Sequence, residues 1–244
     1  METSEYHNIA RLEAGHWWYA GMRALTRAVL ARLPLPPAAQ ILDAGCGVGG
    51  GLRWLAEFGT PTGIDWHPVA AGYAAQVSRR VARASVQALP FPEAAFDAVT
   101  SFEVLYHLAV ADDVAALREF ARVLRPGGWL VVRVPAHDWL RGAHDRLVHT
   151  RHRYEAQELR AKLTRAGLRV RRVTPAGALL LPPAILRRAL QRSSEAHTDV
   201  ALPPPLINRL LTAALAAEGR WLGWADLPFG LSLLAVAQKA GRET

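Results

Sequence analysis

The chain has 244 residues, of which 51% are hydrophobic and 20% charged, as is typical of a globular protein with one α/β domain and an appended element. The formal charge of +8 comes almost wholly from arginine, since Lys162 and Lys239 are the only lysines, and it is weak evidence for nucleic-acid binding. A single cysteine, Cys46, excludes an internal disulfide and a multi-cysteine metal site.

Neither a secretion signal nor a membrane span is predicted. The first residues lack the basic and apolar regions of a signal peptide. The longest apolar run, residues 176–186, contains Pro182-Pro183 and is shorter than the ~20 residues that a spanning helix needs. We therefore expect a cytoplasmic protein.

Residues 3–33 are predicted to form one or two helices. Apolar residues recur at helical spacing from Trp18 to Leu33, and Pro34 stops the pattern. The segment 16–19 (HWWY) places three aromatic residues in a row, and these cannot all face one core because successive helical residues point about 100° apart. Tyr19 and its neighbours either pack in the core or form part of a lid over a ligand.

Residues 40–51 (QILDAGCGVGGG) predict a ligand-binding turn after a buried strand. Glycine at 45, 47 and 49 allows a tight turn and a close approach of the backbone to a ligand. Asp43 precedes the turn, and the helix expected at 52–58 directs its N-terminus at the same place. Asp65 ends the next apolar strand, where a doubly wound sheet places the acid that binds both ribose hydroxyls.

The same residues satisfy the dinucleotide fingerprint, as Gly45-x-Gly47-x-x-Gly50, and that pattern alone is a weak signal. A carboxylate within the turn opposes a pyrophosphate but attracts an ammonium group, such as that of S-adenosylmethionine. The stretch resembles motif I of the class I S-adenosylmethionine-dependent methyltransferases. A nicotinamide-dependent oxidoreductase stays an alternative.

The following elements extend the resemblance. We expect a helix at 69–81, strands at 82–87 and 96–102, a helix at 112–124 and a strand at 129–134. The resemblance to the family is close where a helix is followed by a Leu-Arg-Pro-Gly-Gly turn at 124–128 and then by an apolar strand. The resemblance implies a Rossmann-like, seven-stranded, mostly parallel sheet with helices on both faces.

The C-terminal part predicts a helix at 155–166 and strands at 168–174 and 231–239. Residues 175–227 separate these strands and contain two apolar helical stretches, 184–190 and 206–222. We expect one domain: a helical lid (1–38), a core (39–174 and 228–240) and a helical cap (175–227) inserted before the last strand. The apolar insertion could also be a dimer face or a membrane-surface contact, so monomer and homodimer both remain open.

The resemblance implies a set of cofactor-binding residues. Asp43 and the glycines would hold the methionine end, Asp65 the ribose, and the segment 85–87 the adenine, although Ser85 stands where the family usually has aspartate. The expected residues are Tyr19, Asp43, Gly45, Cys46, Gly47, Gly49, Asp65, Trp66, Ser85, Val86, Gln87, Phe102 and Glu103.

On the acceptor side the candidates are His107, His149, His152 and Tyr154. His107 follows the fourth strand and is either a general base or a histidine that holds its loop. The 149–154 element resembles one that follows the fifth strand in bacterial small-molecule methyltransferases. We expect no metal there, because the neighbouring arginines oppose a cation. The basic stretch 160–172 would suit a phosphate or carboxylate, or is a solvated face.

The predicted function is S-adenosylmethionine-dependent methyl transfer to oxygen or nitrogen of a small molecule in biosynthesis, with an anionic, glycan-like or lipid-like acceptor. In-line displacement chiefly requires that donor and acceptor be brought together. A methyltransferase that modifies RNA or nucleotides, a nicotinamide-dependent oxidoreductase and a non-catalytic binding protein are the alternatives. The acceptor, and the atom that is methylated, stay open.

Overall fold

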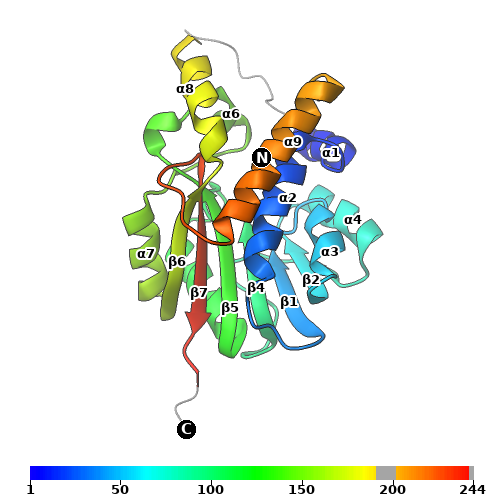
Figure 1. The fold of residues 1–244 in the computed structure, drawn as a ribbon. Coiled ribbons are helices and arrows are strands. Elements are labelled where there is room, and N and C mark those ends of the chain that lie inside the picture. The colour runs from blue at the N-terminus through cyan, green and yellow to red at the C-terminus, as the bar shows by residue number, and fades with distance from the viewer. Residues whose placement is uncertain (191–201, 242–244) are drawn as a thin grey trace.

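A seven-stranded sheet forms the centre of the molecule (Figure 1). The computed structural model describes residues 1–190 and 202–241, without the side chains of residues 143, 144 and 187–190. The strand order is β3-β2-β1-β4-β5-β7-β6, and only β7 runs antiparallel to its neighbours. This confirms the predicted mostly parallel, Rossmann-like sheet. The strands are β1 (Ala39–Ala44), β2 (Gly59–Asp65), β3 (Val81–Arg83), β4 (Phe96–Phe102), β5 (Leu124–Pro135), β6 (Leu168–Ala176) and β7 (Ser232–Lys239).

Helices cover both faces of the sheet. The α-helices are α1 (Thr3–Leu12), α2 (Trp17–Leu30), α3 (Gly50–Leu55), α4 (Pro68–Val77), α5 (Asp113–Val123), α6 (Ala143–Leu147), α7 (Ala156–Arg165), α8 (Leu181–Leu190) and α9 (Pro205–Leu222). Two short 3₁₀ helices, η1 (Asp138–Leu140) and η2 (Ala178–Leu180), precede α6 and α8. Among the described residues no helix is long and apolar enough to cross a bilayer.

The strands are buried on both faces. Side chains of successive residues therefore point to opposite faces and pack in different hydrophobic clusters. Leu42 and Val99 belong to the cluster that contains Phe120 of α5. Ile41 and Ala98 belong to the other cluster, which contains residues of α2 and α9. This two-sided burial explains why the strands read in the sequence as short apolar runs.

α2 and α9 lie side by side on one face of the sheet (Figure 1). Glycines permit the close approach: a Cβ at Gly219 would lie 2.9 Å from the Cα of Leu25, and one at Gly21 would overlap Leu215. Leu222, near the end of α9, packs in the sheet cluster. The sequence interpretation placed these helices in a lid and a cap, whereas much of their length is part of the main core.

Some element ends differ from those expected. β3 ends at Arg83 rather than at residue 87, because Ser85 and Ala88 form a turn: Ala88 N donates to the carbonyl of Ser85, and Gln87 N to its hydroxyl at 3.2 Å. The expected strand at 96–102 coincides with β4.

Candidate active site

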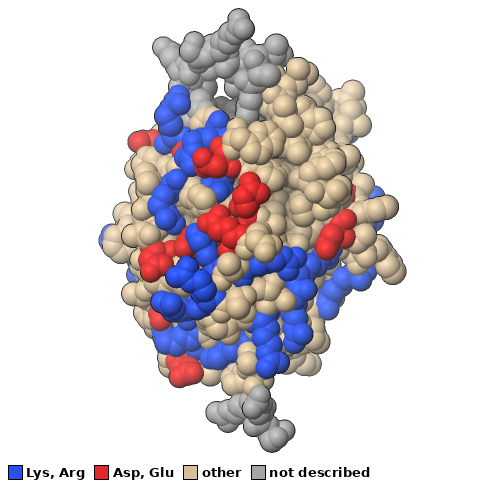
Figure 2. All heavy atoms as spheres, turned by 90° about the vertical axis from the view of Figure 1, so that its left-hand side faces the viewer, with Lys and Arg blue, Asp and Glu red and all other residues tan. Residues whose placement is uncertain are grey.

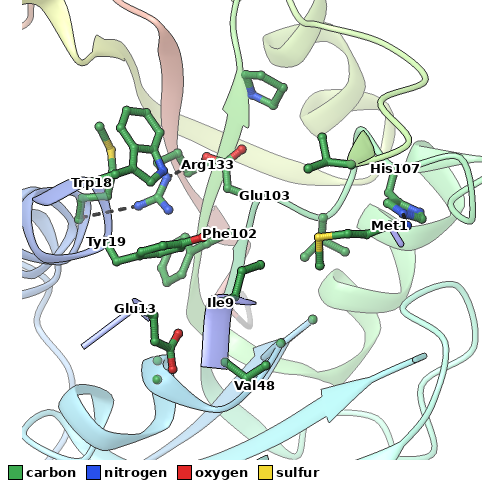
Figure 3. A pocket seen from close by; sticks show the side chains of 18 of the residues that line it. Met1, Ile9, Glu13, Trp18, Tyr19, Val48, Phe102, Glu103, His107 and Arg133 are labelled. Atoms are coloured by element: carbon green, nitrogen blue, oxygen red, sulfur yellow. Dashed lines mark hydrogen bonds and ion pairs between the residues drawn. The ribbon is translucent and has the colours of Figure 1, made fainter. Parts of the chain in front are cut away.

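A cavity of about 1360 Å³ opens at the carboxyl ends of β1, β2, β4 and β5, where doubly wound sheets bind their ligands (Figure 3). Residues of α1 and α2, of the loops after β4 and β5, and of α8 and α9 complete its wall. Sites for one small molecule occupy roughly 300–1,000 Å³, so this cavity has room for two ligands.

The glycine turn after β1 forms the floor of the cavity. Gly45 and Gly47 have φ values of 89° and 55°, and Gly45 N and Cys46 N both donate to the carbonyl of Ile64 at 2.8 Å. A Cβ added at Gly47 would have no atom within 4 Å, so the turn leaves open space there. The backbone is thus shaped to receive a ligand against it.

Asp65 connects the turn to the end of β2. Its Oδ2 accepts a hydrogen bond from Gly47 N at 3.0 Å, and its Oδ1 accepts one from His67 N at 2.8 Å. Burial raises its pKa above the ordinary value, while these two backbone bonds oppose the rise. Each oxygen retains acceptor capacity, so the carboxylate can bind a vicinal pair of hydroxyls.

Asp43 is buried at the end of β1 and accepts a hydrogen bond from Thr100 Oγ1 at 3.0 Å. Burial raises its pKa to about 7, Asp65 and Glu13 add to the rise, and Thr100 and Arg133 oppose it. The ionised carboxylate is therefore poorly compensated in the ligand-free protein, and an incoming ammonium group would stabilise it.

Trp66 and Ser85 lie at the other end of the turn, where adenine is expected. Trp66 lines the cavity and is 58% exposed, with the Arg83 guanidinium 5.5 Å from its ring centre. Ser85 and Val86 also line the cavity. The Ser85 hydroxyl accepts one backbone bond and has a second lone pair for an amine.

Three expected cofactor residues have other roles. Gln87 is not in the cavity wall, because its Oε1 accepts a hydrogen bond from Ala111 N at 2.8 Å. Gly49 begins α3 with a φ of 95°, and a Cβ there would lie 2.9 Å from the Cα of Ala74 in α4, so it serves packing. Cys46 lines the cavity, but burial raises the pKa of its thiol, which suits an apolar filler.

Aromatic and charged side chains form the wall opposite the turn. Tyr19 and Phe102 both line the cavity, and Glu103 points toward Arg133 (Figure 3). Arg133 Nε donates to Glu103 Oε1 at 2.9 Å, and its Nη1 donates to Thr26 Oγ1 at 3.0 Å. Glu103 adopts a left-handed φ of 59°, and its N–H donates to the carbonyl of Arg133.

Arg133 was missed in the sequence interpretation. It is buried in β5 and lines the cavity. The available signal was a charged residue between apolar ones in the run Val-Val-Arg-Val, since a buried charge in a central strand is rare unless it is paired.

His107 and His149 meet at the cavity, with ring centres 5.7 Å apart. Ala109 N donates to His107 Nδ1 at 3.0 Å, and His107 Nε2 lies 2.6 Å from the Met1 amine. Burial, followed by the charge of that amine, lowers its pKa to about 4. With both ring nitrogens engaged and its protonated form disfavoured, His107 is poorly placed to act as a base.

His149 has the opposite orientation. Its Nε2 lies 3.2 Å from the Glu2 carboxylate and its Nδ1 3.0 Å from the Met1 amine. A proton on Nε2 directed at Glu2 leaves the Nδ1 lone pair to accept from the Met1 amine, in a position that an acceptor hydroxyl could take over. Of the two histidines, His149 is therefore the better placed to take a proton.

His152 and Tyr154, expected on the acceptor side, are not among the residues that line this cavity. Tyr154 is fully buried and donates to Asp113 Oδ2 at 2.7 Å. His152 Nε2 pairs with Glu158 at 2.8 Å, and Lys162 bonds the same Asp113 at 2.6 Å. These contacts fasten the loop after β5 to α5 and α7.

A test of this structural role is Tyr154→Phe. We expect the free energy of unfolding to fall by roughly 1–3 kcal/mol, because the buried Asp113 carboxylate loses one donor. Urea denaturation measures this loss. Calorimetry with S-adenosylhomocysteine should show unchanged affinity. A large loss of affinity at preserved stability would show instead that Tyr154 contributes to ligand binding.

The basic stretch at 160–172 also lies away from the cavity. Arg171 bonds Gln238 of β7 at 2.7 Å, and Arg172 bonds Asp226 at 2.6 Å. Figure 2 shows the Lys and Arg side chains spread over the face of α7 and β6, with acidic residues among them. The expectation that this stretch recognises an anionic acceptor is not supported by its position. Among the described residues no group of three His, Cys, Asp or Glu side chains could hold a metal ion.

Comparisons with known proteins agree with this geometry. Residues 42–132 match the family model described as methyltransferase domain. The chain is 38% identical over 112 residues to 2-methyl-6-phytyl-1,4-hydroquinone methyltransferase of Synechocystis. The matched region covers 43% of this chain and 33% of that protein. The chain is also 30% identical over 164 residues to a probable S-adenosylmethionine-dependent methyltransferase of Mycobacterium tuberculosis, Rv3030, covering 65% of this chain and 58% of that one.

A solved S-adenosylmethionine-dependent methyltransferase from Mesorhizobium loti has the same fold, with a TM-score of 0.60, 20% identity and coverage of 88% of this chain and 98% of that one. The fold and the family match support the resemblance to class I S-adenosylmethionine-dependent methyltransferases on which the sequence interpretation rested. The match at residues 42–132 and the name of the Mycobacterium tuberculosis relative support S-adenosylmethionine as the cofactor. The chain spans between a third and three fifths of the length of these two curated relatives.

Proposed function

We propose that this protein transfers a methyl group from S-adenosylmethionine to oxygen or nitrogen of a small molecule with a large apolar part. The observation that carries the proposal is the pair of carboxylates at adjoining strand ends, Asp43 and Asp65, on either side of a glycine turn with open space above it. Asp43 would hold the ammonium, Asp65 the ribose hydroxyls, and Trp66 with Ser85 the adenine.

The acceptor side of the cavity supports an apolar substrate. Trp17, Trp18 and Met22 of α2 line it together with Leu180 and Leu211, which pack against them. Two of the arginines that line the cavity are engaged: Arg133 binds Glu103, and Arg153 forms a buried pair with Asp145 at 2.9 Å. The name of the Synechocystis relative includes a phytyl hydroquinone, an acceptor with this character.

Bound S-adenosylmethionine supplies an electrophilic methyl group for in-line displacement. The chain's residues hold the donor, exclude water and orient the acceptor at near-attack distance. We propose that an acceptor hydroxyl replaces the Met1 amine at His149 Nδ1 and gives its proton to that nitrogen, while Glu2 holds the Nε2 proton.

Two assays test the proposal. Calorimetry should show that S-adenosylhomocysteine binds and that NAD does not. Transfer of a labelled methyl group, measured on a panel of prenylated quinols, fatty acids and polar hydroxy acids, should favour the apolar members. With the acceptor so found, His149→Gln should lower kcat by roughly 10²–10⁴ without changing S-adenosylhomocysteine affinity. Preferential binding of NAD would contradict the cofactor assignment, and exclusive turnover of polar acids would contradict the acceptor class.

A further inference from the structure

One wall of the proposed cofactor site comes from α2 and from the turn before it. Glu13 follows α1, and Tyr19 and Arg23 lie one helical turn apart on α2; all three line the cavity. Figure 3 shows Glu13 and Tyr19 on one side of the cavity, across from Met1 and His107. The family match begins only at residue 42, so it assigns no role to this wall.

Two carboxylates lie at the start of α3, beside this wall. A Cβ added at Gly50 would overlap the Glu13 carboxylate, and one added at Gly51 would overlap Asp43 Oδ2. Burial raises the pKa of Glu13 to about 7, while the positive charges of two arginines, one of them Arg23, oppose the rise. The end of the cavity proposed for the ammonium is therefore rich in acid, and Arg23 lies close enough to act on its charge.

Arg23 is a half-buried arginine without a partner among the described residues. Five of the described arginines line the cavity, and three of these form ion pairs: Arg27 with Glu57, Arg133 with Glu103 and Arg153 with Asp145. The other two, Arg23 and Arg53, form no hydrogen bond or ion pair with a residue that the structure describes, and Arg53 is exposed to water. A guanidinium has five N–H donors, so an anion that bound Arg23 would offset the free-energy cost of its partial removal from water.

We propose that Arg23 binds the carboxylate of the methionine end of S-adenosylmethionine. The ammonium and the carboxylate of this end are attached to one carbon atom, so the groups that bind them must lie close together. Asp43, proposed for the ammonium, and Arg23 are both near Glu13, whose charge raises the pKa of Asp43 and whose own pKa responds to Arg23. A guanidinium binds a carboxylate through two parallel N–H bonds. This role of Arg23 rests on the proposed function, and it makes α2 part of the cofactor site.

Calorimetry with two ligands that differ only in the carboxylate tests the proposal. S-adenosylhomocysteine carries the carboxylate and its decarboxylated analogue does not, whereas both keep the ammonium. Arg23→Gln should lower the affinity for S-adenosylhomocysteine about tenfold or more, because a charge-assisted contact is lost. Its affinity for the decarboxylated analogue should stay within about twofold of that of the unaltered protein.

The matched control is Arg27→Gln, which removes the same charge one helical turn further along α2, where Glu57 already pairs with it. This variant should bind both ligands within about twofold of the unaltered protein. Arg23→Lys keeps the charge without the two parallel donors, so it should recover part of the affinity for S-adenosylhomocysteine. Urea denaturation of each variant shows whether the fold is intact.

An equal loss of affinity for both ligands in Arg23→Gln would overturn the proposal, because Arg23 would then support the site without contacting the carboxylate. A larger selective loss in Arg53→Gln than in Arg23→Gln would overturn it too, since the exposed arginine would then be the carboxylate ligand. If the unaltered protein does not bind S-adenosylhomocysteine, the proposed function itself is wrong. If it binds and Arg23→Gln binds equally well, only the role of Arg23 is wrong.

Discussion

Replacing Asp43 with Asn is expected to stabilise the ligand-free protein and to weaken its cofactor binding. Burial raises the pKa of Asp43 from 3.8 to about 7, so the folded state binds the proton more tightly than the unfolded state does. The resulting stability is full below pH 3.8 and is lost as pH rises through about 7. At pH 8 the asparagine should therefore recover on the order of 2–4 kcal/mol, measured by urea denaturation.

The same change removes the partner of the cofactor ammonium. Asparagine can still accept the Thr100 hydrogen bond, which isolates the loss of charge from the loss of shape. A buried, charge-assisted contact is worth roughly 1.5–3 kcal/mol, so S-adenosylhomocysteine affinity should fall by about 10- to 100-fold in calorimetry. The opposite signs of the two effects distinguish a binding residue from a structural one.

The pH dependence provides a second test. In the unaltered protein, affinity for S-adenosylhomocysteine should rise between about pH 6 and 8 as Asp43 ionises, because the ionised form attracts the ammonium. The Asp43→Asn variant should lose this rise. Asp112→Asn is the matched control, since Asp112 begins α5 outside the cavity and asparagine caps helices equally well. Lower stability with unchanged affinity in Asp43→Asn would show that the carboxylate is structural.

The central sheet and the glycine turn could be predicted because both depend on local sequence. A strand buried on both faces, such as residues 96–102, consists mainly of apolar and small residues, and a turn with several positive φ values favours glycine. These constraints leave the same pattern wherever such a strand and turn occur. The parallel pairing of β1 and β2 places their carboxyl ends side by side, so Asp43 and Asp65 could be assigned to one site before their contacts were known.

The acceptor side could not be predicted to the same depth, because it depends on which face of an irregular segment meets the cavity. Residues 152–154 illustrate the difficulty: Arg153 lines the cavity, whereas the adjacent His152 and Tyr154 do not. Neighbouring side chains of extended backbone point in opposite directions, so a shift of one residue reverses the assignment. Likewise, the packing of α9 on α2 depends on Gly21 lying against Leu215 and Gly219 against Leu25, pairs that are each 194 positions apart, which no local pattern shows.

Replacing Gly45 with Ala should impair folding, whereas replacing Gly47 with Ala should impair binding. Gly45 has a φ of 89°, and an added Cβ would overlap the Val104 side chain. Strain and overpacking together predict a loss of roughly 2–5 kcal/mol. Gly47 has a φ of 55°, within the left-handed region that other residues can adopt at a cost of about 1–2 kcal/mol, and its Cβ would enter open space.

A second substitution separates the steric overlap at Gly45 from the backbone strain there. Val104→Ala in the Gly45→Ala background should restore part of the stability, because it removes the overlapping methyl groups, and the remainder measures backbone strain. Gly47→Ala should keep most of its stability but lose at least about tenfold in S-adenosylhomocysteine affinity, since the methyl group occupies space proposed for the cofactor. Unfolding monitored by circular dichroism and binding monitored by calorimetry give both quantities. Unchanged affinity in Gly47→Ala would mean that the cofactor does not lie against this turn, and the proposed placement of the methionine end would then be wrong.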